Sequence, residues 1–227
     1  MKRLQQGFLL LLLFTLLTHC QDPKKVSILG DSYSTFEGHV FPESNALWYF
    51  KIPRYGTDVS SVNQLWWHQL MEDKRYQLEV NNSFSGSTIC NTGYNNMDAS
   101  CCSFLARMNN LGNPDIIFIF GATNDVWAQA PLGDFQYSDW TKISLYQFRP
   151  AMAFMLDYML KQYPKAKLYF ILNTDLNEAI NESVKTICKY YQVDCIVLKE
   201  IDKIAGHPSI KGMRQIKDQV NSHLNNE

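Results

Sequence analysis

The chain of 227 residues has an ordinary globular composition, with 46% hydrophobic, 13% aromatic and 19% charged residues. Its 21 Lys and Arg residues nearly balance its 22 Asp and Glu residues, which argues against a nucleic-acid binder built on a large basic surface. The composition also excludes an intrinsically disordered chain, a collagen, a coiled coil and a disulfide-stabilised miniprotein. The length suits one domain of generous size.

The first twenty residues have the features of an export signal. Lys2 and Arg3 precede a uniformly apolar run over residues 8–17, and polar residues follow it. Ten apolar residues are too few to span a bilayer as a helix, which needs about 20. A buried core helix is the alternative, but such a helix normally has a polar face, and this run has none. We therefore predict a signal peptide over residues 1–20 and an exported domain over residues 21–227, in the periplasm or cell envelope.

Cys20 closes this segment in a Leu-Thr-His-Cys sequence that resembles the cleavage site of a bacterial lipoprotein. His19 departs from the small residue that is usual before a lipidated cysteine. The resemblance implies a lipid anchor on Cys20 that attaches the protein to a membrane. Among the other cysteines, Cys188 and Cys195 are close enough in sequence to form a disulfide in an oxidising compartment. With no CxxC pair and no paired histidines, the sequence predicts no zinc site.

From residue 25 onward, short apolar runs alternate with segments of helical periodicity. Strands are predicted at residues 25–29, 77–80, 115–120, 167–172 and 194–198. Helices are predicted at residues 61–73, 149–162, 177–191 and 209–222. Because the strands are apolar on both faces, they are typical of a parallel sheet that is covered on both sides. The alternation predicts one α/β domain with a central five-stranded parallel sheet.

Polar residues follow the predicted strands. Ser32 comes directly after the first strand, Gly86 lies in the loop after the second, Asn124 follows the third, and His207 comes beyond the fifth. In open α/β sheets, functional groups gather at the carboxyl ends of the strands. A serine, a glycine loop, an asparagine and a histidine at one edge are the components of acyl transfer, namely a nucleophile, oxyanion donors and an imidazole base.

Each of these residues also has a purely structural interpretation. Asp31 and Ser32 could cap a helix, and Gly86 could satisfy a turn with positive φ. Asn124 could cap a helix or support a turn, and His207 could mark the start of the last helix. Four such interpretations would have to coincide at four strand exits, so the catalytic hypothesis is favoured.

The same residues resemble the four sequence blocks of the SGNH (GDSL-type) hydrolases, in order. The blocks match Gly30-Asp31-Ser32, Gly86, Gly121-Ala122-Thr123-Asn124-Asp125 and His207-Pro208. The segments VNQLWWHQL and SDWTKISLYQFRPAM also look similar to exported members of this family from gut Bacteroidetes. The resemblance covers about residues 25–222 and implies a flavodoxin-like three-layer α/β/α sandwich.

The resemblance implies a serine esterase that forms an acyl-enzyme on Ser32, with His207 as the base. The backbone N–H groups of Gly86 and Ser32 and the side-chain amide of Asn124 would stabilise the oxyanion. The resemblance implies neither a metal nor an organic cofactor.

One position departs from the family pattern. The family commonly has Asp three residues before the histidine, and this sequence has Ile204 there. Asp202 is the best available acid to orient His207, although it could equally be a solvated loop residue. The alternative is that a backbone carbonyl orients the imidazole, which leaves a Ser-His dyad.

Aromatic residues near the predicted site favour an acetylated glycan as the substrate. Seven of them lie within residues 33–60, Trp67 lies off the apolar stripe of its predicted helix, and Trp127 follows Asn124. Aromatic rings beside a polar site can stack on sugar faces. The alternative is that these rings pack their loop against the domain.

Other classes of protein are less consistent with the sequence. A non-catalytic surface lipoprotein that binds glycans would use the same aromatic residues, but it would not explain the presence of Ser32, Asn124 and His207. A phosphatase of the haloacid type would need an Asp where Tyr33 stands. A dinucleotide-binding enzyme would need a GxGxxG turn, which the sequence lacks.

Overall fold

A computed structural model of the protein describes residues 22–226, and the central sheet follows the predicted pattern. The strands are β1 (Lys24–Gly30), β2 (Tyr76–Ser83), β3 (Ile116–Gly121), β4 (Lys167–Leu172) and β5 (Asp194–Val197). They form one five-stranded sheet in the order β2-β1-β3-β4-β5, and every neighbouring pair is parallel. This is the strand order of flavodoxin-like folds, so the predicted fold class is confirmed.

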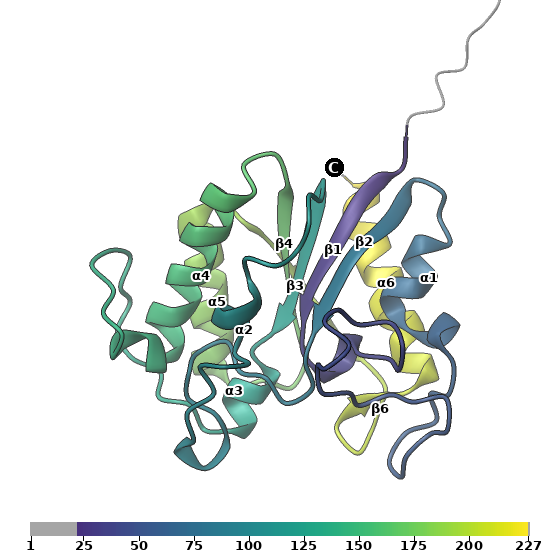
Figure 1. Ribbon diagram of the computed structural model, residues 1–227, viewed down its shortest axis with the longest axis horizontal. Coiled ribbons are helices and arrows are strands. Elements are labelled where there is room, and N and C mark those ends of the chain that lie inside the picture. Colours follow the sequence, from purple (N-terminus) through teal and green to yellow (C-terminus); the bar gives the residue numbers. More distant parts are fainter. Residues whose placement is uncertain (1–21, 227) are drawn as a thin grey trace, which may run out of the picture.

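Helices cover both faces of the sheet and make the fold three layers thick. The helices are α1 (Trp66–Met71), α2 (Phe104–Arg107), α3 (Thr123–Trp127), α4 (Phe148–Gln162), α5 (Glu178–Tyr191) and α6 (Ile210–Asn225). Figure 1 shows α4 and α5 on one side of the sheet and α1 and α6 on the other. Among residues 22–226, no helix is long and apolar enough to cross a membrane.

Strand β3 shows why the sequence of each strand is a continuous apolar run. Ile117 and Ile119 belong to the core on the α4 and α5 side. Phe118 and Phe120 belong to the core on the α1 and α6 side. Because successive side chains of a strand point to opposite faces, a strand covered on both sides needs apolar residues at every position.

The predicted helix over residues 61–73 is shorter in the structure. A 3₁₀ turn covers Val62–Gln64, Leu65 is extended, and α1 begins only at Trp66. Trp67 is 2% exposed, and its Nε1 donates to the carbonyl of Ser34 at 2.9 Å. The expectation that Trp67 lies off the packed face is therefore wrong, because the break at Leu65 lets both tryptophans of α1 pack inward.

A small hairpin between β5 and α6 was not predicted from the sequence. It consists of β6 (Lys203–Ile204) and β7 (His207–Pro208), joined by a two-residue turn. Ala205 and Gly206 have φ of +47° and +80°. Two consecutive positive φ values are the signature of a type I′ turn, which suits a tight hairpin.

Two other expectations concern cysteines and the amino terminus. Cys188 and Cys195 are free thiols in the structure, so the disulfide that their spacing allows is not formed there. The predicted signal peptide and Cys20 lie outside the described residues.

Candidate active site

The sequence-predicted site lies at the carboxyl end of β1. The chain leaves β1 toward β2 and leaves the neighbouring strand β3 toward β4, so these two adjacent strands send their connections to opposite halves of the sheet. Such a switch point opens a crevice in which open α/β folds bind their ligands. Ser32 stands there in a 3₁₀ turn over Ser32–Ser34. The carboxylate of Asp31 caps this turn by accepting from the N–H of Tyr33 at 3.0 Å.

Ser32 and His207 are in direct contact. The distance from Ser32 Oγ to His207 Nε2 is 3.1 Å. The two residues are 175 positions apart in the chain, and both are buried, with exposed fractions of 2% and 5%. An imidazole nitrogen within hydrogen-bond reach of a serine hydroxyl can accept its proton during nucleophilic attack.

The other ring nitrogen of His207 faces a backbone carbonyl. Nδ1 lies 3.2 Å from the carbonyl oxygen of Ala205, in the turn of the β6–β7 hairpin. A carbonyl can only accept, so the neutral imidazole carries its proton on Nδ1 and leaves the Nε2 lone pair for Ser32. This contact selects the imidazole tautomer, as the carboxylate does in a catalytic triad.

Two tyrosine hydroxyls hold the hairpin that carries His207. Tyr33 donates to the carbonyl of Gly206 at 2.5 Å, and Tyr49 donates to the carbonyl of Pro208 at 2.9 Å. Both tyrosines are fully buried. The backbone is therefore fixed on both sides of the histidine.

The imidazole of His207 is enclosed by aromatic rings. Trp48 stacks on it at a centroid distance of 3.5 Å and an interplanar angle of 6°. Trp127 and Tyr33 meet it edge-on, each at 5.5 Å. Burial lowers the pKa of His207 to about 4, the carbonyl of Ala205 opposes this shift, and the positive charges of Arg54 and Lys203 add to it. The ring is therefore neutral at neutral pH, as a general base must be.

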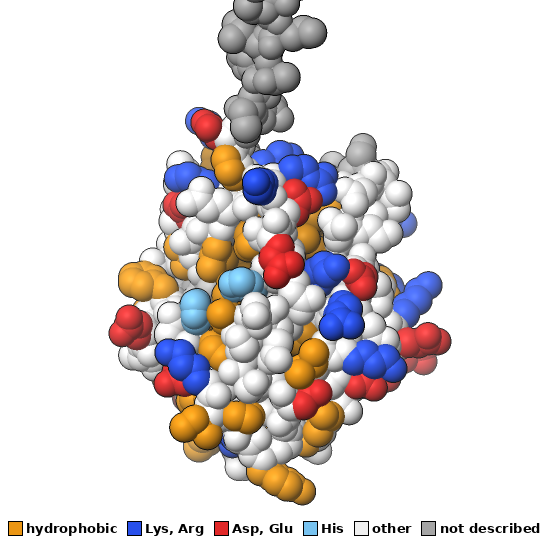
Figure 2. Space-filling model, turned by 90° about the vertical axis from the view of Figure 1, so that its right-hand side faces the viewer, with side chains coloured by type: hydrophobic (Ala, Val, Ile, Leu, Met, Phe, Trp, Pro, Cys, Tyr) orange, Lys and Arg blue, Asp and Glu red, His pale blue; other side chains and the backbone are white. Residues whose placement is uncertain are grey.

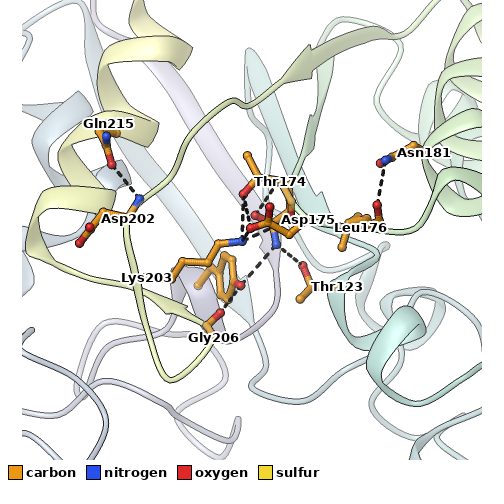
Figure 3. Close-up of polar contacts among 11 residues, drawn as sticks. Thr123, Thr174, Asp175, Leu176, Asn181, Asp202, Lys203, Gly206 and Gln215 are labelled. Carbon is orange, nitrogen blue, oxygen red and sulfur yellow. Dashed lines mark hydrogen bonds and ion pairs between the residues drawn. The ribbon is translucent and has the colours of Figure 1, made fainter.

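Asp202 is engaged elsewhere. Its carboxylate accepts a hydrogen bond from the hydroxyl of Ser209, and its backbone N–H donates to Gln215 Oε1 at 2.8 Å. Figure 3 shows Asp202 beside Gln215 of α6, while Lys203 points toward Thr174 and Asp175. The structure places a backbone carbonyl at Nδ1 of His207, and the Asp202 carboxylate contacts Ser209.

Ile204 occupies the position where the family commonly has an acid. It pairs with His207 across the hairpin, and 38% of it is exposed. The tight turn brings the carbonyl of Ala205 to the imidazole instead. The hairpin thus explains physically how the histidine is oriented without that acid.

Asn124 lies at the start of α3 with its amide group oriented by Tyr94. The phenol of Tyr94 donates to Asn124 Oδ1 at 2.6 Å, and Asn124 Nδ2 lies 3.4 Å from Asp31 Oδ2. The sharp entry into α3 depends on Ala122, whose φ of +75° is unusual for a residue other than glycine. The donor end of the amide therefore points toward the turn that carries Ser32.

Gly86 is an exposed residue in the loop after β2 and has a φ of +85°. The buried guanidinium of Arg107 supports this loop by donating to Ser87 Oγ at 2.7 Å and to the carbonyl of Asn82. Burial lowers the pKa of Arg107 to about 9, and the nearby Asp31 opposes the shift. The positive φ agrees with the turn interpretation of Gly86, which is compatible with an oxyanion donor at its N–H.

A second buried group stabilises the segment that follows Gly86. The carboxylate of Asp125 accepts from the N–H groups of Ile89 and Cys90 at 2.9 and 3.2 Å. Burial raises the pKa of Asp125 to about 6, and these backbone donors oppose the shift. Asp125 follows Asn124 directly, so the loop after β2 and the start of α3 are fixed to each other.

Several residues of the site were not singled out by sequence reasoning. Trp48 was one of seven aromatic residues in a long segment. Three others of that segment (Tyr33, Phe36 and Tyr49) are buried, and two of these, Tyr33 and Tyr49, hold the His207 hairpin. Tyr94 and Arg107 stand outside any motif. The contacts of Tyr94 and Arg107 join segments 30 and 20 residues apart, which is why neither local periodicity nor spacing could find them.

The fold and the site together define a class of protein. A buried serine paired with a neutral imidazole, beside an oriented amide at the switch point of an α/β sheet, is an arrangement for acyl transfer. Comparison with known proteins agrees, because the family profile described as GDSL-like Lipase/Acylhydrolase matches residues 24–224. The chain belongs to this family and is an ester hydrolase.

Two solved structures are similar over most of their length. One is from Bacteroides ovatus ATCC 8483 and is assigned to the GDSL-like lipases. It has 58% sequence identity and a TM-score of 0.90, with 91% of this chain and 100% of that chain covered. The other is from Bacteroides uniformis ATCC 8492 and has the same assignment. Its identity is 48% and its TM-score 0.89, with 91% and 98% covered. No curated protein matches the chain significantly.

A more distant structure shares the fold. It is a family two carbohydrate esterase from Clostridium thermocellum in complex with cellohexaose, with 14% identity and a TM-score of 0.61. The match covers 90% of this chain and 65% of that one.

Proposed function

We propose that the protein is a serine esterase that removes short acyl groups from carbohydrates through an acyl-enzyme on Ser32. The observation that carries the proposal is the 3.1 Å contact between Ser32 Oγ and His207 Nε2, together with the carbonyl of Ala205 at Nδ1. These contacts supply a nucleophile, a base and the acceptor that selects the productive tautomer.

In the first half of the reaction, Ser32 Oγ attacks the ester carbonyl and its proton passes to His207 Nε2. The negative charge that develops on the carbonyl oxygen is stabilised by Asn124 Nδ2 and the N–H groups of Gly86 and Ser32. One such donor typically contributes about 3–4 kcal/mol to the transition state. The tetrahedral intermediate then collapses, and His207 Nε2–H protonates the departing alcohol.

In the second half, water attacks the acyl-enzyme. His207 accepts a proton from the water, and the same donors stabilise the second oxyanion. Collapse of this intermediate returns the proton to Ser32 Oγ and releases the carboxylic acid. During both steps the imidazolium keeps its Nδ1–H on the carbonyl of Ala205, which spreads the positive charge into the peptide dipole.

The carbohydrate part of the proposal rests on the surroundings of the serine. Trp127 is 42% exposed and meets His207 edge-on, so an aromatic surface is available beside the leaving group. The fold neighbour from Clostridium thermocellum is a carbohydrate esterase, which is consistent with this substrate class.

The test is hydrolysis of p-nitrophenyl acetate and of acetylated xylan by the wild type and by Ser32→Ala, with folding checked by circular dichroism. We expect turnover of both esters by the wild type and its loss in the variant. Near wild-type turnover by Ser32→Ala would show that Ser32 is not the nucleophile. Binding of the glycan without turnover by the wild type would instead favour a glycan-binding protein on the same fold.

A further inference from the structure

A hollow lies next to Tyr94 and Trp127, two residues that contact Asn124 and His207. It has a volume of about 350 Å³ and is lined by Tyr94, Asn95, Asn96, Trp127, Ala128 and Gln129. Two of these residues also contact the candidate active site. Tyr94 donates to Asn124, and the ring of Trp127 lies 5.5 Å from that of His207. The hollow and the site therefore share a wall.

The lining of this hollow suits a neutral, hydroxyl-rich ligand. Trp127 and Tyr94 are 42% and 36% exposed and provide aromatic surface. Three carboxamide side chains add both hydrogen-bond donors and acceptors, and none of the six lining residues carries a formal charge. Aromatic surface with a few convergent polar groups is the usual chemistry of a small-molecule site. A sugar ring offers matching apolar faces and hydroxyl groups.

The backbone around the hollow is held in an uncommon conformation. Asn95, Asn96 and Gln129 have φ values of +55°, +57° and +55°. The loop that carries the two asparagines is closed by a hydrogen bond from the N–H of Gly93 to the carbonyl of Met97 at 2.8 Å. Left-handed residues other than glycine cost free energy and cluster at ligand sites. Three such residues around one hollow indicate that the backbone fixes the direction of each carboxamide side chain.

We propose that this hollow is the subsite for the sugar ring that carries the ester. The proposal rests on the proposed function, because in a sugar ester the departing alcohol is the sugar itself. That alcohol oxygen must approach His207 Nε2 to receive its proton, and Trp127 extends from His207 into the hollow. The volume is near the lower end of the usual range for ligand sites, about 300–1,000 Å³. It therefore suits a monosaccharide unit rather than a long acyl chain.

Another hollow, lined in part by Ile204 and Ala205 of the His207 hairpin, is the competing position for the sugar ring. It has about 360 Å³ and is lined by Tyr55, Gly56, Thr57, Asp58, Ile204 and Ala205. Tyr55 is fully exposed there. The hollow beside Tyr55 serves as the comparison in the experiment.

The experiment compares two kinds of acetate ester. Ethyl acetate has a leaving group too small to fill the hollow, whereas monoacetylated glucose, galactose and xylose place a ring in it. The variants are Asn95→Gly and Gln129→Gly, since glycine accepts a positive φ without strain. Gln192→Gly is the matched control, because Gln192 has a φ of +56° at the carboxyl end of α5. Tyr55→Ala tests the competing hollow.

For at least one sugar acetate, we expect kcat/KM to fall about threefold to tenfold in Asn95→Gly and Gln129→Gly, as the loss of one hydrogen bond implies. Ethyl acetate hydrolysis should be unchanged in both. Gln192→Gly and Tyr55→Ala should resemble the wild type on all esters. Equal effects on both kinds of ester, no effect, or a selective effect of Tyr55→Ala would overturn the subsite.

A binding measurement separates this inference from the proposed function. Ser32→Ala should bind the same sugar acetates in saturation-transfer NMR, and the signal should weaken when Gln129→Gly is added. If the wild type hydrolyses no ester while this binding is observed, the proposed function fails and the subsite stands. If the wild type hydrolyses ethyl acetate but no sugar acetate binds, the subsite fails and the esterase stands.

Discussion

His207 is constrained on one ring face and at both ring nitrogens. Trp48 covers one face, Ser32 Oγ meets Nε2, and the carbonyl of Ala205 meets Nδ1. In a Ser-His-Asp triad the acid selects the tautomer and stabilises the imidazolium. Here the carbonyl selects the tautomer as well as an acid would, but it brings no full negative charge to the imidazolium.

The role of Asp202 can be tested by Asp202→Asn. The asparagine keeps an oxygen that accepts from Ser209, so we expect turnover within about tenfold of the wild type, whereas His207→Ala should lose nearly all of it. In a triad, substitution of the acid costs about 10⁴ in turnover. The measurement is kcat on a short-chain ester, with circular dichroism as the folding control. A loss of about 10³ or more for Asp202→Asn would make Asp202 a member of a triad.

The loss of activity at acid pH should follow protonation of the buried His207 imidazole. Because burial lowers the pKa of His207 to about 4, the base is neutral and active down to about pH 5. We expect kcat/KM to fall tenfold per pH unit below about 4, since protonation removes the base. Burial raises the pKa of Asp31 to about 7 and that of Asp125 to about 6, so any smaller change between pH 8 and 5 belongs to these two carboxyl groups and not to His207.

The same measurement on Trp48→Leu tests the cause of this shift. Removing the indole admits water to the ring face, so the acid limb should move toward the ordinary histidine value of about 6.5. Arg54 and Lys203 are the charged groups that act on the ring. The Arg54 guanidinium lies 4.3 Å from the centroid of the Trp48 ring, so losing the indole also releases this cation, and its withdrawal would raise the pKa of His207 in the same direction. A limb that moves to lower pH would show instead that stacking on the indole stabilises the imidazolium.

At the level of elements, Gly212 determines how closely α6 approaches the segment before the hairpin. A Cβ at this position would lie 2.0 Å from the carbonyl oxygen of Asp202. Alanine normally stabilises a helix relative to glycine by about 1 kcal/mol. Here the clash is with backbone, so the segment that leads to His207 would have to move.

We therefore expect Gly212→Ala to lower the free energy of unfolding by about 1–3 kcal/mol, as overpacking does. It should also reduce kcat, because the hairpin shifts His207 away from Ser32. Lys211→Ala, at the exposed neighbouring position, is the control and should leave both unchanged. Urea denaturation and ester hydrolysis measure the two effects, and a Gly212→Ala protein as stable as the wild type would contradict the prediction.

The elements differ in how far the sequence could predict them. The strands were predicted to within a few residues because burial on both faces leaves uninterrupted apolar runs, as in β3. The α1 region was not, because the extended Leu65 interrupts a sequence with good helical periodicity. The β6–β7 hairpin was missed because its strands are two residues long and its turn uses Ala205 in place of the usual Asn or Asp.

The residues of the candidate site also differ in how far the sequence could predict them. Ser32, Gly86, Asn124 and His207 follow strands or precede a helix, so the topology of a parallel sheet predicts that they meet at one edge. The orienting carbonyl of Ala205 could not be predicted, because every residue has a carbonyl and only the fold selects one. The stacking of Trp48 on His207 likewise depends on a contact between segments about 160 residues apart in the sequence.

At the scale of the whole molecule, basic and acidic side chains are mixed on the face visible in Figure 2, with no large area of one sign. Figure 2 shows Lys and Arg interspersed with Asp and Glu on the face over α1 and α6. This agrees with the near balance of 21 basic and 22 acidic residues in the sequence. Such a balance provides little long-range electrostatic attraction for a charged ligand.

Export of the protein remains a prediction from residues 1–20. We expect the native protein to lack residues 1–19 and to carry a diacylglycerol on Cys20, and mass spectrometry of the amino-terminal peptide measures both. Cys20→Ser should move the protein from the membrane fraction to the soluble fraction. An unprocessed Met1 in the native protein would exclude export, and a processed but unacylated terminus would exclude the anchor alone.

Both ends of the described chain lie at the end of the sheet that is opposite to Ser32. The N–H of Lys24 donates to the carbonyl of Arg75 at 2.8 Å, and the Arg75 guanidinium donates to Asn225 Oδ1 at 3.1 Å. Figure 1 shows the start of β1 and the carboxyl terminus together at one end of the molecule and β6 at the other. The protein can therefore be coupled to a bead, or fused to another module, through either end of the described chain, while the opposite end of the sheet, which carries Ser32, stays free of the attachment.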